Sequence, residues 1–135
     1  YVSYDFGPLA LTVTNYTFPD GDGTYSTGGF FEGDLEISAS TEIGGLSLMG
    51  GYFPDLETLY IEAGFGLGAV DFAIGFGSDS ADAFYVGAGE SAICNVSFSY
   101  SKEIKITDDY SLPLFSSFIL NPKSEGAFIV IGASF

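Results

Sequence analysis

The chain has 135 residues, enough for one domain spanning residues 1–135, and it is rich in Gly (19), Phe (14) and Tyr (9). Three Lys or Arg residues stand against 18 Asp or Glu residues, for a formal net charge of −15, so nucleic acid is not expected as a partner. One Cys and no His exclude an intrachain disulfide and a His/Cys zinc site, and no cofactor is predicted.

Apolar and polar residues alternate along almost the whole chain, which is the period of a β-strand. The pattern predicts nine strands, near residues 1–6, 8–18, 29–40, 44–53, 57–66, 69–77, 92–106, 111–121 and 126–135. Short turns are predicted at 7–8, 41–43, 67–68 and 107–110, and most of them contain Gly, Pro or Asp. Longer connections are predicted at 19–29 and 78–91.

The two faces of these strands differ in kind. In the stretch "FFEGDLEISAS", Phe31, Leu35 and Ile37 alternate with carboxylates and serines. A soluble β-sandwich alternates in the same way, but its water-exposed face is expected to carry Lys, Arg, Thr and Gln. Here the polar faces carry Gly, Ala, Ser and carboxylates, and small side chains suit the concave inside of a barrel. We therefore predict an all-β, antiparallel meander that crosses the bacterial outer membrane as a β-barrel, with lipid against its apolar face.

The last strand, "GAFIVIGASF", ends on an aromatic residue. A terminal aromatic that closes an amphipathic strand resembles the signal by which the barrel assembly machinery recognises outer-membrane barrels. The residues on the apolar face of this candidate assembly signal are Ile129, Ile131, Ala133 and Phe135. Cys94 is expected on the apolar face of its own strand, beside Val96, as a small lipid-facing or buried hydrophobic residue and not as a reactive thiol.

A wider resemblance rests on "YVSYDFGPLALTVTNYTFP", "SKEIKITDDYSLP" and "LPLFSSFILNPKSEGAFIVIGASF". These stretches are similar to the C-terminal part of the TorF-family putative porins, small outer-membrane proteins. The resemblance implies a monomeric barrel with a pore-like role and supplies no catalytic residues. It also implies further strands ahead of the segment that matches Tyr1.

Strand parity agrees with that implication. If Phe135 ends in the periplasm, residues 19–29 and 78–91 lie outside the cell, and so does Tyr1. Bacterial single-chain barrels have an even number of strands and begin in the periplasm. Either an odd number of N-terminal strands is missing or the count of nine is off by one, and we expect roughly three missing strands and a parent barrel of about twelve strands.

Carboxylates on the polar faces would line the lumen of such a barrel. They would attract cations, since rings of charge set selectivity in pores; the alternative is that they hydrate a narrow lumen or pair with basic residues on other strands. The candidate residues are Glu32, Asp34, Glu36, Glu62 and Asp71.

The stretch "DGDGT" at residues 20–24 resembles the start of a calcium loop through Asp20 and Asp22. Tyr25 and Phe31 occupy the positions where an EF-hand needs Gly and Glu, so we predict an Asx- and Gly-rich loop with at most weak calcium binding.

No nucleophile and base can be assembled from these residues, so an enzyme is not predicted. Three functions remain. The first is a porin-like barrel that gives small cationic or neutral solutes passive passage through an acidic lumen. The second is a barrel without a transport role, acting as a structural subunit of a larger outer-membrane complex. The third is a soluble, secreted acidic β-sandwich that binds calcium or a basic ligand.

Overall fold

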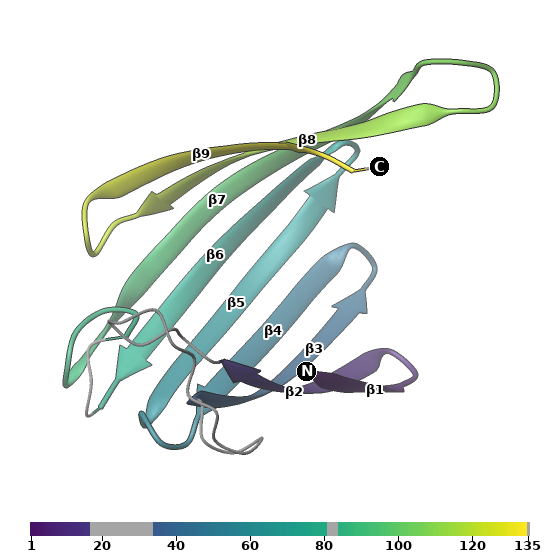
Figure 1. Ribbon diagram of the computed structural model, residues 1–135. Coiled ribbons are helices and arrows are strands. Elements are labelled where there is room, and N and C mark those ends of the chain that lie inside the picture. Colours follow the sequence, from purple (N-terminus) through teal and green to yellow (C-terminus); the bar gives the residue numbers. More distant parts are fainter. Residues whose placement is uncertain (17–33, 81–83, 135) are drawn as a thin grey trace, which may run out of the picture.

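The computed structural model describes residues 1–16, 34–80 and 84–134. They form one nine-stranded antiparallel sheet in which every strand pairs with the next one along the chain (Figure 1). The all-β meander predicted from the alternation is thereby confirmed. Within these residues, no helix is long and apolar enough to cross a membrane. The strands are β1 (Val2–Phe6), β2 (Leu9–Tyr16), β3 (Asp34–Ile43), β4 (Leu46–Phe53), β5 (Thr58–Leu67), β6 (Val70–Asp79), β7 (Glu90–Lys105), β8 (Ser111–Asn121) and β9 (Gly126–Ala133).

The turn between β3 and β4 differs from the prediction. Residues 41–43, predicted as a turn, are the last residues of β3, and the turn consists of Gly44 and Gly45. Both glycines have positive φ, 60° and 81°. A two-residue hairpin turn of this kind matches the twist of the flanking strands and requires positive φ at both positions, which glycine adopts without strain. The polar residues Thr41 and Glu42 therefore belong to the strand.

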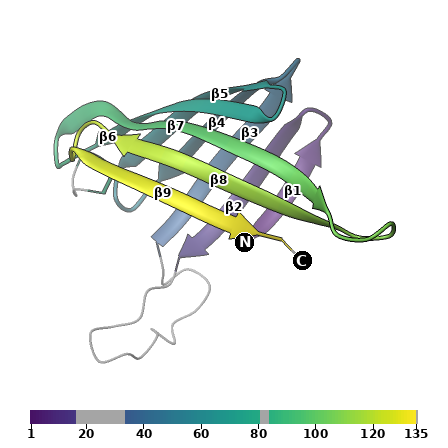
Figure 2. The ribbon, with the colours of Figure 1, turned by 90° about the horizontal axis from the view of Figure 1, so that it is seen from above.

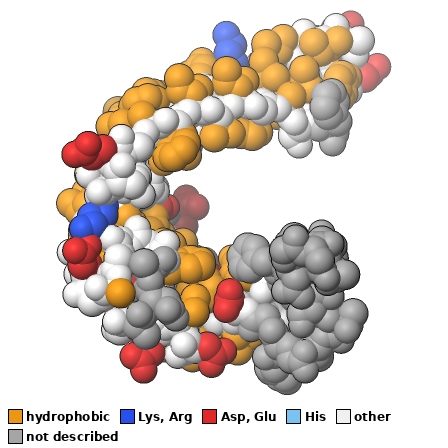
Figure 3. Space-filling view, turned by 60° about the vertical axis from the view of Figure 1, so that its left-hand side comes forward, with side chains coloured by type: hydrophobic (Ala, Val, Ile, Leu, Met, Phe, Trp, Pro, Cys, Tyr) orange, Lys and Arg blue, Asp and Glu red, His pale blue; other side chains and the backbone are white. Residues whose placement is uncertain are grey.

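The sheet is strongly curved and remains open. In the space-filling view the molecule is C-shaped (Figure 3), and the sheet begins and ends with β1 and β9, each paired on one side only. All eight buried residues of the described part occupy one face of the sheet, where side chains converge. We call this the inner face, and the opposite one the outer face. The buried residues are Gly51, Phe53, Thr58, Gly64, Gly75, Gly77, Asp79 and Cys94.

A β-bulge in β7 changes the face that one residue occupies. Gly75 pairs with Asn95 and Phe76 pairs with Ile93, so Cys94 has no partner on β6. The extra residue shifts the alternation, and Cys94 lies buried on the inner face, near Gly77. Its expected position beside Val96 on the apolar outer face is wrong for this reason.

The connections sort to the two ends of the sheet. The short turns after β1, β3 and β5 and the hairpin loop between β7 and β8 lie at one end, and residues 84–89, which lead into β7, lie at the other (Figures 1 and 2). Strand β7 is long enough to pair with β6 through Glu90–Tyr100 and with β8 through Val96–Lys105. The β7–β8 hairpin therefore projects beyond the rest of the sheet (Figure 1).

Candidate functional site

Four of the five predicted acidic residues lie at inner-face positions: Asp34 and Glu36 in β3, Glu62 in β5 and Asp71 in β6. Glu32 lies outside the described residues. A pocket of about 270 Å³ brings Glu62 and Asp71 together and adds Glu42, which was not among the predicted residues. Asp34 and Glu36 do not line this pocket; the Glu36 carboxyl group faces Gly51 of β4.

Glu62 is the centre of a hydrogen-bonded cluster on the inner face. Its Oε2 accepts from the Tyr60 hydroxyl at 2.5 Å and from Asn95 Nδ2 at 2.8 Å. Asn95 Nδ2 also donates to the Tyr60 hydroxyl at 3.1 Å, so the three side chains form a closed ring. Hydrogen bonds to a carboxylate are stronger than neutral ones, and each also restricts the donor's orientation. The cluster therefore holds Tyr60 and Asn95 in place across β5 and β7.

Glycine makes room for this cluster. Gly75 of β6 lies between Glu62 and Asn95 in the sheet register, and an ideal Cβ at residue 75 would lie 2.6 Å from Tyr60 Cζ. Any side chain there would displace the phenol ring. The glycines of the inner face thus serve the close approach of larger side chains across the strands.

A second anchor holds part of the 80–89 connection against the inner face. Asp79, the last residue of β6, is buried, and its Oδ2 accepts the backbone N–H groups of four consecutive residues at 2.7–3.0 Å. Its Oδ1 accepts from the Thr58 hydroxyl at 3.1 Å. We call residues 84–87, which supply the four N–H groups, the clamped segment. These hydrogen bonds offset the free-energy cost of burying the Asp79 carboxylate, because a carboxylate can accept from several N–H groups at once. They also satisfy four backbone donors that would otherwise lie unpaired.

The clamped segment places aromatic rings over the inner face. The Tyr85 ring lies 5.0 Å from that of Tyr60, and the Phe84 ring lies 4.9 Å from that of Phe53. Tyr16, at the end of β2, reaches Phe53 at 5.7 Å, so the cluster extends from β2 across β4 and β5 to the clamped segment. Burial, with a smaller contribution from the nearby Glu36 carboxylate, raises the pKa of the Tyr85 phenol above its ordinary value.

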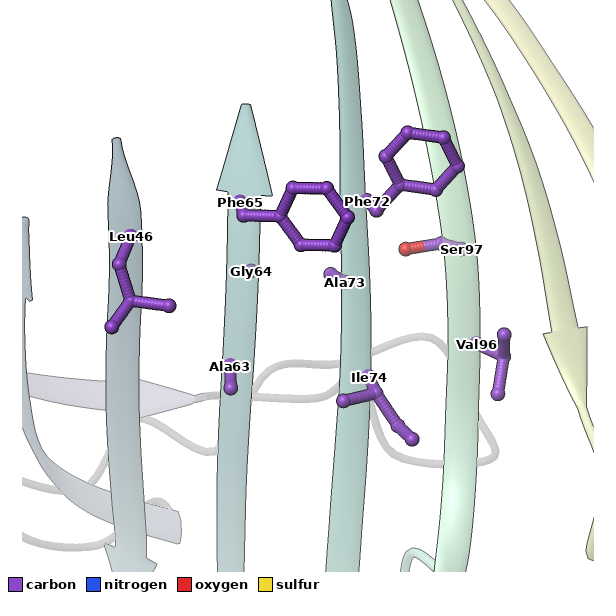
Figure 4. Close-up of a pocket in the computed structure, with 9 residues that line it drawn as sticks. All are labelled: Leu46, Ala63, Gly64, Phe65, Phe72, Ala73, Ile74, Val96 and Ser97. Carbon is purple, nitrogen blue, oxygen red and sulfur yellow. The ribbon is translucent and has the colours of Figure 1, made fainter. Parts of the chain in front are cut away.

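The outer face is apolar and carries one shallow depression of about 240 Å³ (Figure 4). Ala63 forms its floor, because its neighbours on the same face are larger. Phe65 and Phe72 stack beside it, with ring centroids 5.1 Å apart. The depression offers no charged side chain and so has no means to bind a polar ligand specifically.

The predicted assembly-signal residues lie on this outer face. Ile129 and Ile131 of β9 are 72% and 78% exposed, and Ala133 is exposed beside them. Phe135 lies outside the described residues, as do Asp20 and Asp22 of the calcium prediction. In the described part of the chain, no three His, Cys, Asp or Glu side chains lie close enough together to hold a metal ion.

The sequence did not predict most residues of the hydrogen-bonded cluster around Glu62 or the contact of Asp79 with the clamped segment. Alternation places Tyr60 on the same face as Glu62 without indicating a role, and Asp79 falls within the connection predicted at 78–91. Their spacing in "TLYIE" and "GSDSADAFYVG" is compatible with these contacts but does not specify them. Comparison with known protein families, curated proteins and solved structures found no match to this chain.

Proposed function

We propose that this chain forms the wall of a bacterial outer-membrane β-barrel that gives small solutes passive passage through an acidic lumen. The observation that carries the proposal is the division between the two faces. Of the described hydrophobic residues other than glycine, only Phe53 and Cys94 are buried, whereas large apolar side chains cover the outer face. Exposing one such side chain to water costs about 1.5–3 kcal/mol, so this surface suits lipid far better than water.

The barrel itself requires closure of the open sheet. In a meander of nine antiparallel strands, β1 and β9 run in the same direction. Antiparallel closure between these two edges therefore takes an odd number of further strands, and a barrel of about twelve strands meets the requirement. Unpaired edges do not persist in the hydrocarbon layer, since every backbone polar group there needs a partner.

The inner face supports a preference for cations. The inward-facing carboxylates include Glu36, Glu62 and Asp71, and the chain has only three Lys or Arg residues to offset 18 Asp or Glu residues. Two of the lysines already pair elsewhere, Lys105 with Asp108 and Lys123 with Glu90. A lumen lined in this way attracts cations and excludes anions.

Two measurements test this function. Protein folded in detergent should migrate differently on a denaturing gel before and after boiling. In a planar bilayer with a salt gradient it should conduct, with a reversal potential shifted toward the equilibrium potential of the cation. Identical migration together with solubility without detergent would contradict the membrane barrel and favour the soluble acidic β-sandwich. Conductance without cation preference would contradict the role of the carboxylates.

The clamped segment favours a second candidate, a barrel without a transport role that serves as a structural subunit of an outer-membrane complex. Phe84 and Tyr85 occupy part of the inner face and are held there by Asp79. A lumen filled by side chains does not conduct. Heat-modifiable migration without conductance, together with copurification of other outer-membrane proteins, would select this candidate.

A further inference from the structure

A pocket of about 330 Å³ lies on the inner face, between the clamped segment and strands β5, β7, β8 and β9. Aromatic rings and side-chain amides form much of its wall. It is lined by Tyr60, Phe84, Tyr85, Cys94, Asn95, Ile119, Asn121 and Phe128. A cavity of this size holds a small organic molecule, and its aromatic walls distinguish it from the acidic pocket around Asp71.

Two tyrosine rings of this pocket are fixed in position. Tyr85 is held through its backbone N–H, which donates to Asp79 at 2.8 Å, and its Cβ would lie 2.7 Å from an ideal Cβ at Gly77. Tyr60 is held through its hydroxyl, which donates to Glu62. The rings pack against each other, 5.0 Å apart and inclined by 33°, and present a surface that needs no rearrangement before a ligand binds.

The charge around this surface is negative and lacks a fixed counter-ion. Glu62 forms no ion pair with any of the chain's three lysines: Lys105 and Lys123 pair elsewhere, and Lys102 lies at an outer-face position of β7, opposite Leu114 of β8. A phenol that donates its hydrogen bond to a carboxylate also presents a more electron-rich ring face. Both features favour a cation over the rings.

We propose that this pocket binds an organic cation of the alkylammonium class, with its charged nitrogen against the packed pair of Tyr60 and Tyr85 and within the electrostatic field of Glu62. The proposal rests on the proposed function only in requiring that solutes reach the inner face. A bare metal ion is not the ligand, because the pocket wall has no carboxylate to replace its hydration shell. A neutral sugar would make no use of the uncompensated charge.

The test is an NMR titration of the folded protein in detergent, following the Asn95 side-chain amide and the Tyr85 backbone amide. Choline should cause saturable shifts, whereas its neutral isostere 3,3-dimethylbutan-1-ol and an equal concentration of NaCl should not. Tyr85→Leu should weaken choline binding roughly 2- to 30-fold, the range of one cation–π contact. Glu62→Gln keeps the size of the side chain and an acceptor oxygen, and it should weaken binding through the loss of charge. Tyr110→Leu, on the exposed β7–β8 connection, should leave binding unchanged.

Three outcomes would overturn the proposal. Equal shifts with the neutral alcohol would make the pocket an apolar site, equal shifts with NaCl would make it a general acidic surface, and no saturable shift would leave it without this ligand. If Tyr85→Leu does not fold, as judged by circular dichroism, Glu62→Gln still decides the outcome. Choline binding without bilayer conductance would contradict only the porin-like function, and conductance without choline binding only this pocket.

Discussion

The phenol ring of Tyr60 occupies the space that a side chain on Gly75 would need, although the two residues lie on neighbouring strands and are 15 positions apart. This contact lets the Tyr60 hydroxyl reach Glu62 and Asn95. The glycine of β6 and the tyrosine of β5 thus form one unit of the inner face.

Gly75→Ala should break this unit. The added methyl group overlaps the Tyr60 ring, so the ring moves, the hydrogen bonds to Glu62 weaken, and the free energy of unfolding falls by about 1–3 kcal/mol. Urea unfolding of the protein in detergent measures the change. Gly50→Ala is the matched control, since its added Cβ would meet only ordinary contact at 3.8 Å. Equal effects from both variants would show that loss of a strand glycine, not this contact, is responsible.

Asp79→Ala should release the clamped segment. Four N–H groups lose their acceptor, and we expect the free energy of unfolding to fall by roughly 2–4 kcal/mol. Cys94, the only cysteine, is buried near Tyr85 and Val86, so its rate of labelling by a maleimide should rise. Thr58→Val removes one hydrogen bond to Asp79 and should raise the rate less. An unchanged labelling rate in Asp79→Ala would mean that the segment stays in place without the carboxylate.

Neighbouring residues of β7 offer a test of which face meets lipid. Val96 lies on the outer face and Ser97 on the inner face. Val96→Lys should oppose membrane insertion by about 2–4 kcal/mol, the cost of Lys near the middle of the hydrocarbon layer, whereas Ser97→Lys should be tolerated in a wet lumen. Folding yield in lipid vesicles measures both. The reverse order would place the inner face against lipid.

The turn "NPKSEG" should gain stability from a glycine. Glu125 has φ of 56°, a left-handed conformation that costs a residue with a Cβ roughly 1 kcal/mol. Glu125→Gly should therefore raise the free energy of unfolding by about 0.5–1 kcal/mol, after the entropy that glycine adds to the unfolded chain. Ser124→Gly, without a positive φ to relieve, should lower it. Unfolding in urea compares the two variants.

Neutralising the inner-face charge should reduce cation preference if the barrel conducts. The double variant Glu62→Gln/Asp71→Asn removes two carboxylates that line one pocket, so its reversal potential in a planar bilayer should move toward zero. Asp108→Asn, in the exposed β7–β8 connection, removes one charge far from the inner face and serves as the control. A shift of the same size in Asp108→Asn would attribute selectivity to net charge alone.

The sequence by itself determined the all-β class, the strand count and the face that carries carboxylates. It also predicted a long connection, at 78–91, although Ser78 and Asp79 belong to β6 and Glu90 and Ser91 to β7. Each follows from alternation and turn composition, which are local properties of the chain. The misplaced turn between β3 and β4 also has a local cause. Residues 41–43 lack the glycines that a two-residue turn requires, and the neighbouring pair Gly44 and Gly45 has them.

Only the tertiary structure decided the position of Cys94 and the make-up of the inner face. A single unpaired residue in β7 reverses the alternation there, and no composition signal marks it. The contacts of Tyr60 with Gly75 and Asn95 depend on the register of three strands, and the clamp on Asp79 depends on the path of the backbone after β6. Alternation assigns a side chain to a face, but pairing between strands determines which side chain it meets there.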